Sequence, residues 1–243
     1  MAATSETDLT DAVLHPVRGH HAFESSVGQL GTAIRLGVYP NGSSLPPERE
    51  LAERMAVSRA TLREAITALR TAGLVRTTRG RGGGTVVVHH PTPPARGAPL
   101  DLGARRDALL DSLVFRRVVE PGACYLAASR TLTDVQEKLL ADALEEVSEA
   151  TDPGLHRQAD SRLHLAIATT TDSRRTIEAV TSVQADLHDM LTAIPVLEVN
   201  IEHSADQHRA VVGAILDGDA TRARRVMERH CDDTAALLRG LLG

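Results

Sequence analysis

The chain has 243 residues, of which 42% are hydrophobic and 24% charged, the balance of an ordinary globular protein. Its two cysteines exclude a disulfide-stapled secreted framework, and no apolar run reaches the roughly 18 residues of a membrane-spanning helix. Because the N-terminal residues are polar and acidic, we expect no signal peptide and a cytoplasmic protein that does not bind membranes.

The net charge of -5 at pH 7 is unevenly distributed. Residues 22–90 carry nine arginines and five glutamates, whereas residues 91–243 hold more acidic than basic side chains. A basic segment joined to an acidic one indicates that the first binds a polyanion, although two ordinary domains of unequal charge would give the same pattern. Aromatic residues make up only 2%, which disfavours base stacking as the mode of binding.

Residues 89–100 mark a boundary between two domains. They read HHPTPPARGAPL, and four prolines in this stretch prevent a continuous helix or a central strand. Helix and strand signals are mixed before the stretch, and helical periodicity dominates after it. The sequence therefore predicts a mobile arm at 1–21, a first domain at 22–88, a linker at 89–102 and an all-helical second domain at 103–243.

Three helices are predicted at the start of the first domain. The first covers residues 23–36. Pro46 and Pro47 suit the first turn of a short second helix, and Ser58 is a good N-cap for the third helix, which ends at Gly73. Two helices joined by so short a turn match a DNA-reading helix-turn-helix.

The third helix has an apolar face and a basic face. At about 100° per residue, Leu62, Ala65 and Leu69 form a stripe that would pack on the first two helices. Arg59 and Arg63 are four residues apart, so both point toward one patch, where guanidinium groups could bind guanine edges and phosphates. A solvated helix face would carry the same charges, so this pattern alone leaves both interpretations open.

A β-hairpin is predicted after the third helix. Residues 74–78 and 85–88 have strand character, and RGRGGG lies between them. The glycines allow close backbone approach, and Arg79 and Arg81 bring positive charge to the tip. The loop precedes a strand rather than a helix N-terminus, which disfavours a nucleotide-phosphate cradle. A basic hairpin after a helix-turn-helix is typical of a winged helix.

The segment LPPERELAERMAVSRATLREAITALRTAGLVRTTRGRGGGTVV resembles the winged-helix signature of GntR-type bacterial regulators. By this resemblance, arginines of the second and third helices contact DNA and the wing enters the minor groove. Pro47 stands where the family usually has Ser or Thr, which removes a phosphate hydrogen bond. The candidate DNA-binding residues are Arg49, Ser58, Arg59, Thr61, Arg63, Arg79, Arg81 and Gly82.

Six helical segments are predicted in the second domain. Their approximate limits are 103–130, 133–151, 154–171, 173–193, 198–217 and 219–240. The short connections between them favour an antiparallel six-helix bundle. The predicted fold class is therefore mainly α, with a winged helix-turn-helix (helices plus a small β-hairpin) followed by the bundle.

A candidate metal site lies in this bundle. Asp160 and His164 are spaced i, i+4 on one helix, which places a carboxylate beside an imidazole. His208 and His230 lie on consecutive helices that fold back at Gly218, ten residues before it and twelve after it, so they reach a similar height. Three imidazoles and one carboxylate suit a divalent metal, Zn²⁺ first and Ni²⁺, Mn²⁺ or Fe²⁺ as alternatives, with coordination positions left open.

The second domain resembles the FCD ligand-binding domain of FadR-type regulators, a subfamily of the GntR group. The matching features are FRRVVEPGACYLAA, D-x-x-x-H, QH-x-x-x-x-x-A-I and the late His230. The resemblance implies that the four candidate ligands bind a metal and that Arg116 is a pocket arginine, which would pair with the carboxylate of a small effector. A surface salt bridge is the alternative role for Arg116. Leu163 replaces a common Phe, which changes the shape of the pocket.

These features predict a DNA-binding transcriptional regulator that acts as a repressor. A homodimer would place two recognition helices on a pseudo-palindromic operator in double-stranded DNA, and a small carboxylate bound at the metal would change the affinity for that operator. The metal could instead be structural or itself the signal. A metalloenzyme is the remaining alternative, which the winged helix and the lack of a marked general base disfavour. We expect the protein to be nucleoid-associated.

Overall fold

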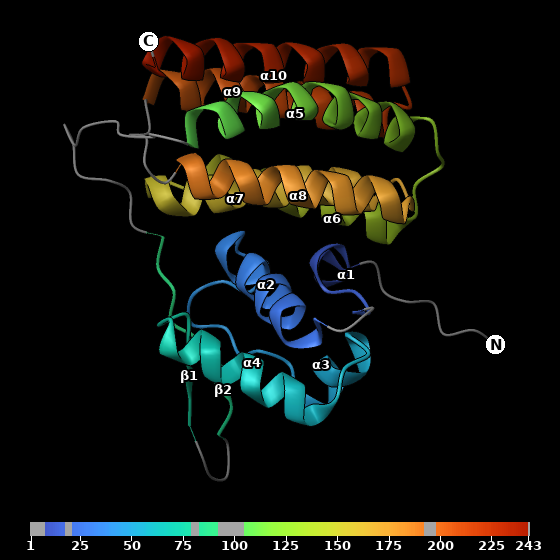
Figure 1. Cartoon of the computed structure of the whole chain (residues 1–243). Coiled ribbons are helices and arrows are strands. Elements are labelled where there is room, and N and C mark those ends of the chain that lie inside the picture. The colour runs from blue at the N-terminus through green and yellow to red at the C-terminus, as the bar shows by residue number, and fades with distance from the viewer. Residues whose placement is uncertain (1–7, 18–20, 79–82, 92–104, 192–197, 243) are drawn as a thin grey trace. The chain divides into compact units, whose positions relative to one another are not determined.

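The computed structural model describes residues 8–17, 21–78, 83–91, 105–191 and 198–242. The chain divides into two compact units, Leu9–Pro91 and a second unit that contains the helices from residue 105 onward (Figure 1). The described residues are mostly helical, with one small β-hairpin in the first unit. The fold class predicted from the sequence is confirmed.

The first unit is a winged helix-turn-helix. Its described elements are α1 (Leu9–Val13), α2 (Ala22–Arg35), α3 (Glu48–Arg54), α4 (Arg59–Thr71), β1 (Val75–Thr77) and β2 (Thr85–Val87). Helix α4 packs against both α2 and α3. The predicted apolar stripe of α4 is buried, at 0% exposure for Leu62 and Ala65 and 2% for Leu69. Burial of this stripe leaves the neighbouring stripe of α4, which carries the exposed Arg59 and Arg63, toward solvent.

Within residues 1–21, which the sequence predicts to be a mobile arm, the structure contains the helix α1. Helix α1 packs on α2, and Ala12, Val13 and Leu14 are buried. The chain after the helix is also held, because the Val17 N–H donates to the carbonyl oxygen of Met55 at 2.8 Å. Residues 1–11 are polar and acidic, but the consecutive apolar side chains of Ala12, Val13 and Leu14 are sufficient to dock one helical turn on a neighbouring helix.

The connection from α3 to α4 sets the direction of the recognition helix. Ala56 has a φ of 52°, in the left-handed region that reverses the chain within a few residues. Ser58 then caps α4, because its side-chain oxygen accepts a hydrogen bond from the backbone N–H of Thr61 at 3.0 Å. The N-terminal turn of α4 is thereby fixed, as the sequence predicted.

The wing is an antiparallel pair of short strands. Val75 faces Val87, and Thr77 faces Thr85 at the end of the described pairing. An additional bridge joins Ser44 to Val86, which ties the segment before α3 to the hairpin. Arg79, Arg81 and Gly82, the predicted wing residues, lie outside the described residues.

The second unit is a helical bundle in which each of the six predicted segments corresponds to one helix. The helices are α5 (Arg105–Ala128), α6 (Asp134–Glu149), α7 (Pro153–Thr169), α8 (Arg174–Leu191), α9 (Glu198–Leu216) and α10 (Ala220–Leu242). They lie side by side with similar axis directions in Figure 1. Helix α5 contacts four others, α7, α8, α9 and α10, so its inward side chains reach the centre of the unit.

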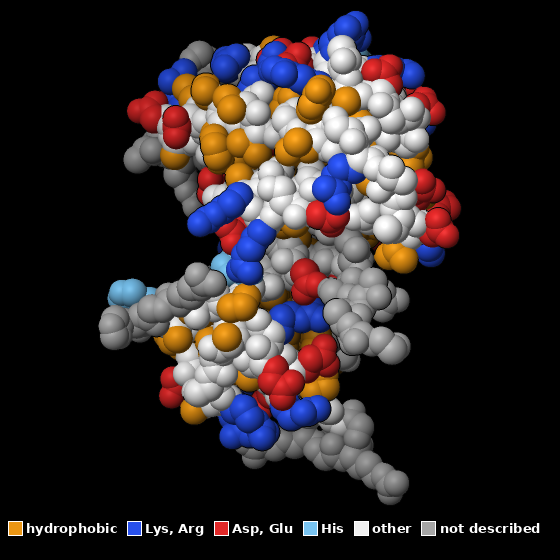
Figure 2. Space-filling model, turned by 90° about the vertical axis from the view of Figure 1, so that its right-hand side faces the viewer, with side chains coloured by type: hydrophobic (Ala, Val, Ile, Leu, Met, Phe, Trp, Pro, Cys, Tyr) orange, Lys and Arg blue, Asp and Glu red, His pale blue; other side chains and the backbone are white. Residues whose placement is uncertain are grey.

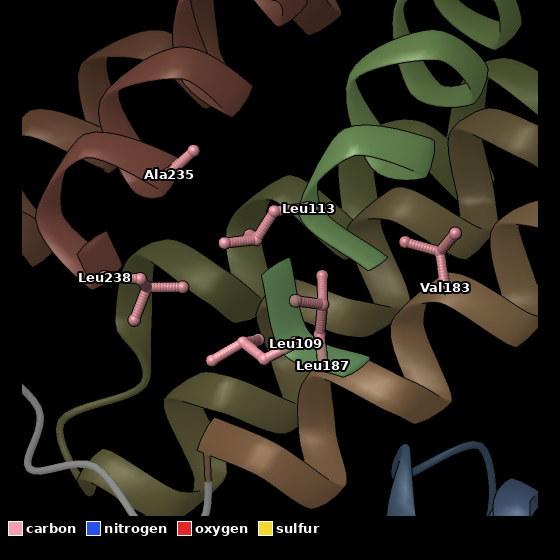
Figure 3. Packing of buried hydrophobic residues seen from close by; sticks show 6 residues of the cluster. All are labelled: Leu109, Leu113, Val183, Leu187, Ala235 and Leu238. Carbon is pink, nitrogen blue, oxygen red and sulfur yellow. The ribbon is translucent and has the colours of Figure 1, made fainter. Parts of the chain in front are cut away.

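Apolar packing fixes the position of α5 within the bundle. Leu109 and Leu113 of α5, Val183 and Leu187 of α8, and two residues of α10 form one buried cluster (Figure 3). Burial of such aliphatic side chains contributes about 1.5–3 kcal/mol each. One further turn along α5, the inward positions are occupied by Arg116 and Glu120 instead, and both are buried. The apolar cluster therefore holds a helix that brings two charged groups into the interior.

Candidate metal centre and DNA-binding surface

Four predicted metal ligands converge inside the second unit. Asp160 and His164 come from α7, His208 from α9 and His230 from α10, and one ligand atom from each lies within 4.8 Å of all the others. His208 Nε2 is 3.3 Å from Asp160 Oδ1, and His164 Nε2 is 4.0 Å from Asp160 Oδ2. The three histidines are buried, whereas the Asp160 side chain is 29% exposed. The sequence spacing thus placed these residues correctly.

Hydrogen bonds orient two of the imidazoles toward the centre. His164 Nδ1 lies 3.0 Å from Glu120 Oε2, and because a carboxylate only accepts, Nδ1 carries the hydrogen. His230 Nδ1 lies 3.0 Å from Gln207 Oε1, while Gln207 Nε2 donates to Asp233 Oδ2 at 2.7 Å. Both Nε2 atoms therefore keep their lone pairs for the centre, the arrangement found in metal-binding histidines.

Glu120 is the centre of a buried network that the sequence analysis missed. Its carboxylate accepts hydrogen bonds from Arg116 Nε at 2.9 Å and Gln184 Nε2 at 2.6 Å, and Cys231 Sγ is 3.7 Å away. Burial by itself would raise the pKa of Glu120, but Arg116 and His164 hold that pKa well below its usual range. The only sequence signal for this role is the i, i+4 spacing of Glu120 from Arg116.

Arg116 lies beside the same imidazoles. Its Nη2 is 2.8 Å from His230 Nε2 and 3.3 Å from His164 Nε2, so the guanidinium donates to the lone pairs that a metal would use. The side chain is buried and paired with Glu120, which excludes the alternative of a surface salt bridge. Burial would lower the pKa of Arg116, but Glu120 raises it, so the group is a permanent cation. A metal ion on these nitrogens would require the Arg116 N–H groups to turn away.

Two imidazoles of the cluster, those of His208 and His230, are in the form that binds metals. Burial lowers the pKa of His208 to about 4, although Asp160 opposes the shift, and burial and Arg116 lower the pKa of His230 well below its usual value. Both rings are therefore neutral near pH 7, the protonation state that coordination needs. His208 Nδ1 is buried without a hydrogen-bond partner among the described residues, an unusual state for a buried polar atom.

His156 is a fourth imidazole near the cluster. It lies on α7 four residues before Asp160, it is buried, and no hydrogen-bond partner of its Nδ1 is found in the described part of the chain. The sequence analysis assigned it no role, although its spacing from Asp160 repeats the spacing of Asp160 from His164. Its free ring nitrogen adds a polar group to the surroundings of the candidate ligands.

The donor set fits a divalent metal. Three nitrogen atoms and one carboxylate oxygen are ligands that Zn²⁺, Ni²⁺, Mn²⁺ and Fe²⁺ accept, with metal–nitrogen distances of about 2.0–2.1 Å for zinc. The ligand atoms lie within 4.8 Å of one another, so the side chains would have to move inward and Arg116 would have to turn away to form such a sphere. When bound, the metal would supply Lewis acidity and coordination positions for an oxygen ligand.

The predicted DNA-binding residues of the first unit lie on α3, α4 and the turn between them. Arg59 and Arg63 are exposed on α4. Arg63 Nε donates to Glu48 Oε2 at 2.8 Å, and Arg49 pairs with Glu53 at 3.3 Å. Ser58 and Thr61 bond to each other at the start of α4. The described arginines are thus available to phosphates or base edges, but two of them have carboxylate partners in the unbound protein.

Comparison with known proteins agrees with both halves of this architecture. The model of the family described as "Bacterial regulatory proteins, gntR family" matches residues 25–87, and the FCD domain model matches residues 111–233. The chain belongs to the GntR family and carries an FCD domain. The gntR-family match falls in the first unit and the FCD match in the second unit.

Several similar proteins match most of the chain. It is 31% identical to RmpR, a proposed transcriptional regulator of Mycobacterium gastri, over 85% of this chain and 76% of the relative. It is 33% identical to the proposed L-lactate dehydrogenase operon regulatory protein of Escherichia coli, over 78% of this chain and 75% of the relative. LutR of Bacillus subtilis is 25% identical, over 85% of this chain and 96% of the relative. These relatives are named as regulators, so the GntR-family chain is a transcriptional regulator and not an enzyme.

Solved structures support the same fold. McbR/YncC of Escherichia coli matches with a TM-score of 0.53 at 17% identity, over 93% of this chain and all of the other. A GntR regulator of Rhodococcus sp. RHA1 matches with a TM-score of 0.52 at 22% identity, over 91% of this chain and 99% of the other. Among the described residues, no helix is long and apolar enough to cross a membrane.

Proposed function

We propose that this GntR-family regulator is a repressor whose affinity for operator DNA is controlled by a small carboxylate bound at a metal in the FCD domain. The observation that carries the proposal is the cluster of Asp160, His164, His208 and His230 with the cationic Arg116 beside it. A carboxylate could place one oxygen on the metal and the other on the guanidinium, a charge-assisted contact. Zn²⁺ is the metal that this donor set favours first.

The DNA side of the proposal rests on the first unit. We propose that Arg49, Ser58, Arg59, Thr61 and Arg63 contact DNA, together with the wing residues Arg79, Arg81 and Gly82. A homodimer would bind a pseudo-palindrome with one α4 helix in each half-site. The protein would act at the nucleoid in the cytoplasm, where its operator lies. The effector can change operator affinity only to the extent that it binds the DNA-binding arrangement of the protein and the released arrangement with different affinities.

The test combines ligand binding with operator binding. Metal-loaded protein is screened by thermal shift against small monocarboxylic and hydroxy acids, with a chelated sample as control. L-lactate belongs in the panel because one relative is named for an L-lactate dehydrogenase operon. An acid at 100 times its dissociation constant should add about 2.7 kcal/mol of stability. The same acid should release a fluorescent operator fragment. A shift that survives chelation, or a shift without any effect on operator binding, would overturn the proposal.

A second candidate is that the metal itself is the signal. Arg116 already donates to the lone pairs of His164 and His230, so the cluster would change its contacts on metal binding. In that case metal alone, without any acid, changes operator affinity. Titration of chelated protein with Zn²⁺ while operator binding is followed separates the two candidates.

A further inference from the structure

A chain of hydrogen bonds leads from the surface of the second unit to the buried ring of His230. Asp233 Oδ2 is 3.0 Å from His203 Nε2 and accepts a hydrogen bond from Gln207 Nε2 at 2.7 Å. Gln207 Oε1 is in turn 3.0 Å from His230 Nδ1. The side chains of His203 and Asp233 are 58% and 42% exposed, whereas Gln207 and His230 are buried. The chain therefore joins a hydrated surface to a candidate metal ligand.

Two neighbouring helices supply the four side chains. His203 and Gln207 are spaced i, i+4 on α9, and His230 and Asp233 are spaced i, i+3 on α10, so each pair lies on one side of its helix. The two helices pack against each other. In Figure 2, blue and red side chains lie together along the top of the upper unit, where α10 lies in Figure 1. Asp233 thus belongs to a charged surface, although its partner Gln207 lies inside.

Asp233 decides which end of the Gln207 amide faces His230. The hydrogen bond from His203 holds the pKa of Asp233 below its ordinary value, burial opposes this shift, and Gln207 adds to it. Asp233 is therefore a carboxylate, which only accepts hydrogen bonds, so the Gln207 atom beside it must be the nitrogen. The amide oxygen then faces His230 Nδ1 and accepts its hydrogen. A reversed amide would face Nδ1 with N–H groups and would favour the hydrogen on Nε2.

The three histidines of the cluster differ in their outer partners. His164 Nδ1 faces the Glu120 carboxylate, which can only accept. His208 Nδ1 has no hydrogen-bond partner in the part of the chain that the structure describes. His230 Nδ1 faces an amide, which can donate or accept according to its orientation. Of these rings, His230 is thus the one whose hydrogen position depends on a third group.

Arg116 supports the same ring only while no metal is bound. Its Nη2 donates to His230 Nε2 at 2.8 Å and so keeps the ring hydrogen on Nδ1. A metal ion at Nε2 would displace this guanidinium. Gln207 would then be the remaining described side chain that holds the ring by a hydrogen bond, and the orientation of its amide depends on Asp233.

We propose that Asp233 is a positioning residue of the metal centre: it fixes the Gln207 amide so that the amide oxygen accepts the Nδ1 hydrogen of His230 and the Nε2 lone pair faces the metal position. The inference rests on the metal site of the proposed function and adds to it a surface residue that determines metal affinity. Asp233 acts through two other side chains and is not itself a ligand. Outer groups that orient a metal-binding imidazole in this way strengthen metal binding.

The first test measures zinc affinity in the full chain by competition with a chromogenic chelator. Asp233→Ala removes the acceptor, and we expect zinc binding to weaken by about 10-fold. Asp233→Lys should weaken it further, because an ammonium group only donates and draws the Gln207 oxygen away from His230. Asp232→Lys is the control, since Asp232 is an exposed neighbour that pairs with Arg117 outside this chain of hydrogen bonds.

The comparison separates positioning from packing. Thermal melts of the metal-free variants show that they are folded, and a purely structural role would lower those melting temperatures without changing zinc affinity in the folded protein. Equal zinc affinities of Asp233→Lys and Asp232→Lys would overturn the inference, and so would an Asp233→Ala variant that binds zinc as well as the wild type.

A second substitution should rescue the Asp233→Lys variant. Gln207→Glu places a carboxylate that can accept hydrogen bonds from the introduced ammonium and from His230 Nδ1 at the same time. The double variant D233K/Q207E should therefore recover most of the zinc affinity that Asp233→Lys loses. A double variant that binds zinc no better than Asp233→Lys contradicts the proposed route through Gln207.

The position of the ring hydrogen can be measured without any metal. Long-range ¹H–¹⁵N NMR spectra of histidine-labelled, metal-free protein distinguish a hydrogen on Nδ1 from one on Nε2. Arg116→Gln removes the other donor to His230, and in this variant we expect the hydrogen on Nδ1, held by Gln207. In the double variant R116Q/D233K we expect it on Nε2. The same hydrogen position in both variants would overturn the inference.

The inference and the proposed function fail in different ways. A wild-type protein that binds no zinc would remove the proposed effector site, whereas the spectra of the metal-free variants would still decide the role of Asp233. A protein whose zinc affinity follows the Asp233 series, but whose operator binding ignores every acid, retains the positioning role and loses the proposed effector control.

Discussion

His164 and Glu120 form a buried imidazole–carboxylate pair, with Nδ1 and Oε2 3.0 Å apart, although they lie on different helices. The pair directs His164 Nε2 toward Asp160 and the other histidines. Glu120 therefore acts on a candidate ligand without being one. Outer groups of this kind orient metal ligands and raise their basicity.

We expect Glu120→Gln to weaken metal binding by about 10–100-fold. A glutamine can offer its amide N–H to His164 Nδ1, which would move the ring hydrogen to Nε2 and remove the lone pair that faces the centre. The dissociation constant for Zn²⁺ is measured by competition with a chromogenic chelator, with Glu145→Gln, an exposed carboxylate on α6, as control. The change also leaves Arg116 with a weaker partner. A thermal melt must therefore show that the Glu120→Gln variant is folded. Unchanged zinc affinity in the folded variant would show that Glu120 serves packing alone.

Arg116→Gln tests the second charged group on the inner side of α5. We expect the thermal shift caused by the effector acid to disappear, because the cation that pairs with the carboxylate is gone, while zinc binding is kept or strengthened. Zinc binding should not suffer, since the guanidinium no longer competes for the nitrogens of His164 and His230.

The control for this prediction is the neighbouring Arg117→Gln. Arg117 forms ion pairs with Glu228 and Asp232 at the surface. Neither of these partners belongs to the metal cluster. Its variant should respond to the acid like the wild type. An Arg116→Gln protein with a full acid response would exclude Arg116 from the effector site.

The sequence predicted those features that depend on local periodicity. The three helices of the helix-turn-helix and the six helices of the bundle follow from apolar spacing and from caps such as Ser58 and Gly218. Two patterns were sufficient to place the four candidate ligands together. Asp160 and His164 are four residues apart on one helix, and His208 and His230 lie at similar distances from the turn between two consecutive helices.

Other features depend on contacts that no local pattern encodes. Glu120 meets His164 across 44 positions of sequence and Gln184 across 64, so its role becomes visible only when α5, α7 and α8 are packed together. Helix α1 was missed because its burial depends on the surface that α2 offers, and because the residues before it are polar and acidic.

Operator affinity should rise when Glu48 is neutralised. Glu48 accepts a hydrogen bond from Arg63 at 2.8 Å, so DNA must compete with this carboxylate for the guanidinium. An exposed ion pair of this kind contributes about 0–1 kcal/mol, so Glu48→Gln should strengthen binding by up to about 5-fold. Glu64→Gln, also exposed and on α4, controls for the general loss of negative charge.

Fluorescence anisotropy with an operator fragment measures these effects, and Arg63→Ala belongs in the same series. If Arg63 reads a base, its removal should cost about 1–3 kcal/mol of binding free energy. In the Arg63→Ala background, Glu48→Gln should lose its benefit beyond that of Glu64→Gln. Equal effects of Glu48→Gln in both backgrounds would mean that the ion pair does not limit DNA binding.

Ser58→Ala separates the structural role of Ser58 from its proposed DNA contact. The Ser58 side chain caps α4 by accepting the Thr61 N–H, so its loss should destabilise the protein by about 1 kcal/mol, whereas Ser58→Gly should cost only a few tenths. Thermal melts of the two variants measure this difference, and anisotropy measures their operator affinity. A capping role predicts that affinity is better retained in Ser58→Gly than in Ser58→Ala. Equal and large losses of affinity in both variants, at unequal stability, would instead assign the hydroxyl to a direct contact with DNA, because both substitutions remove it.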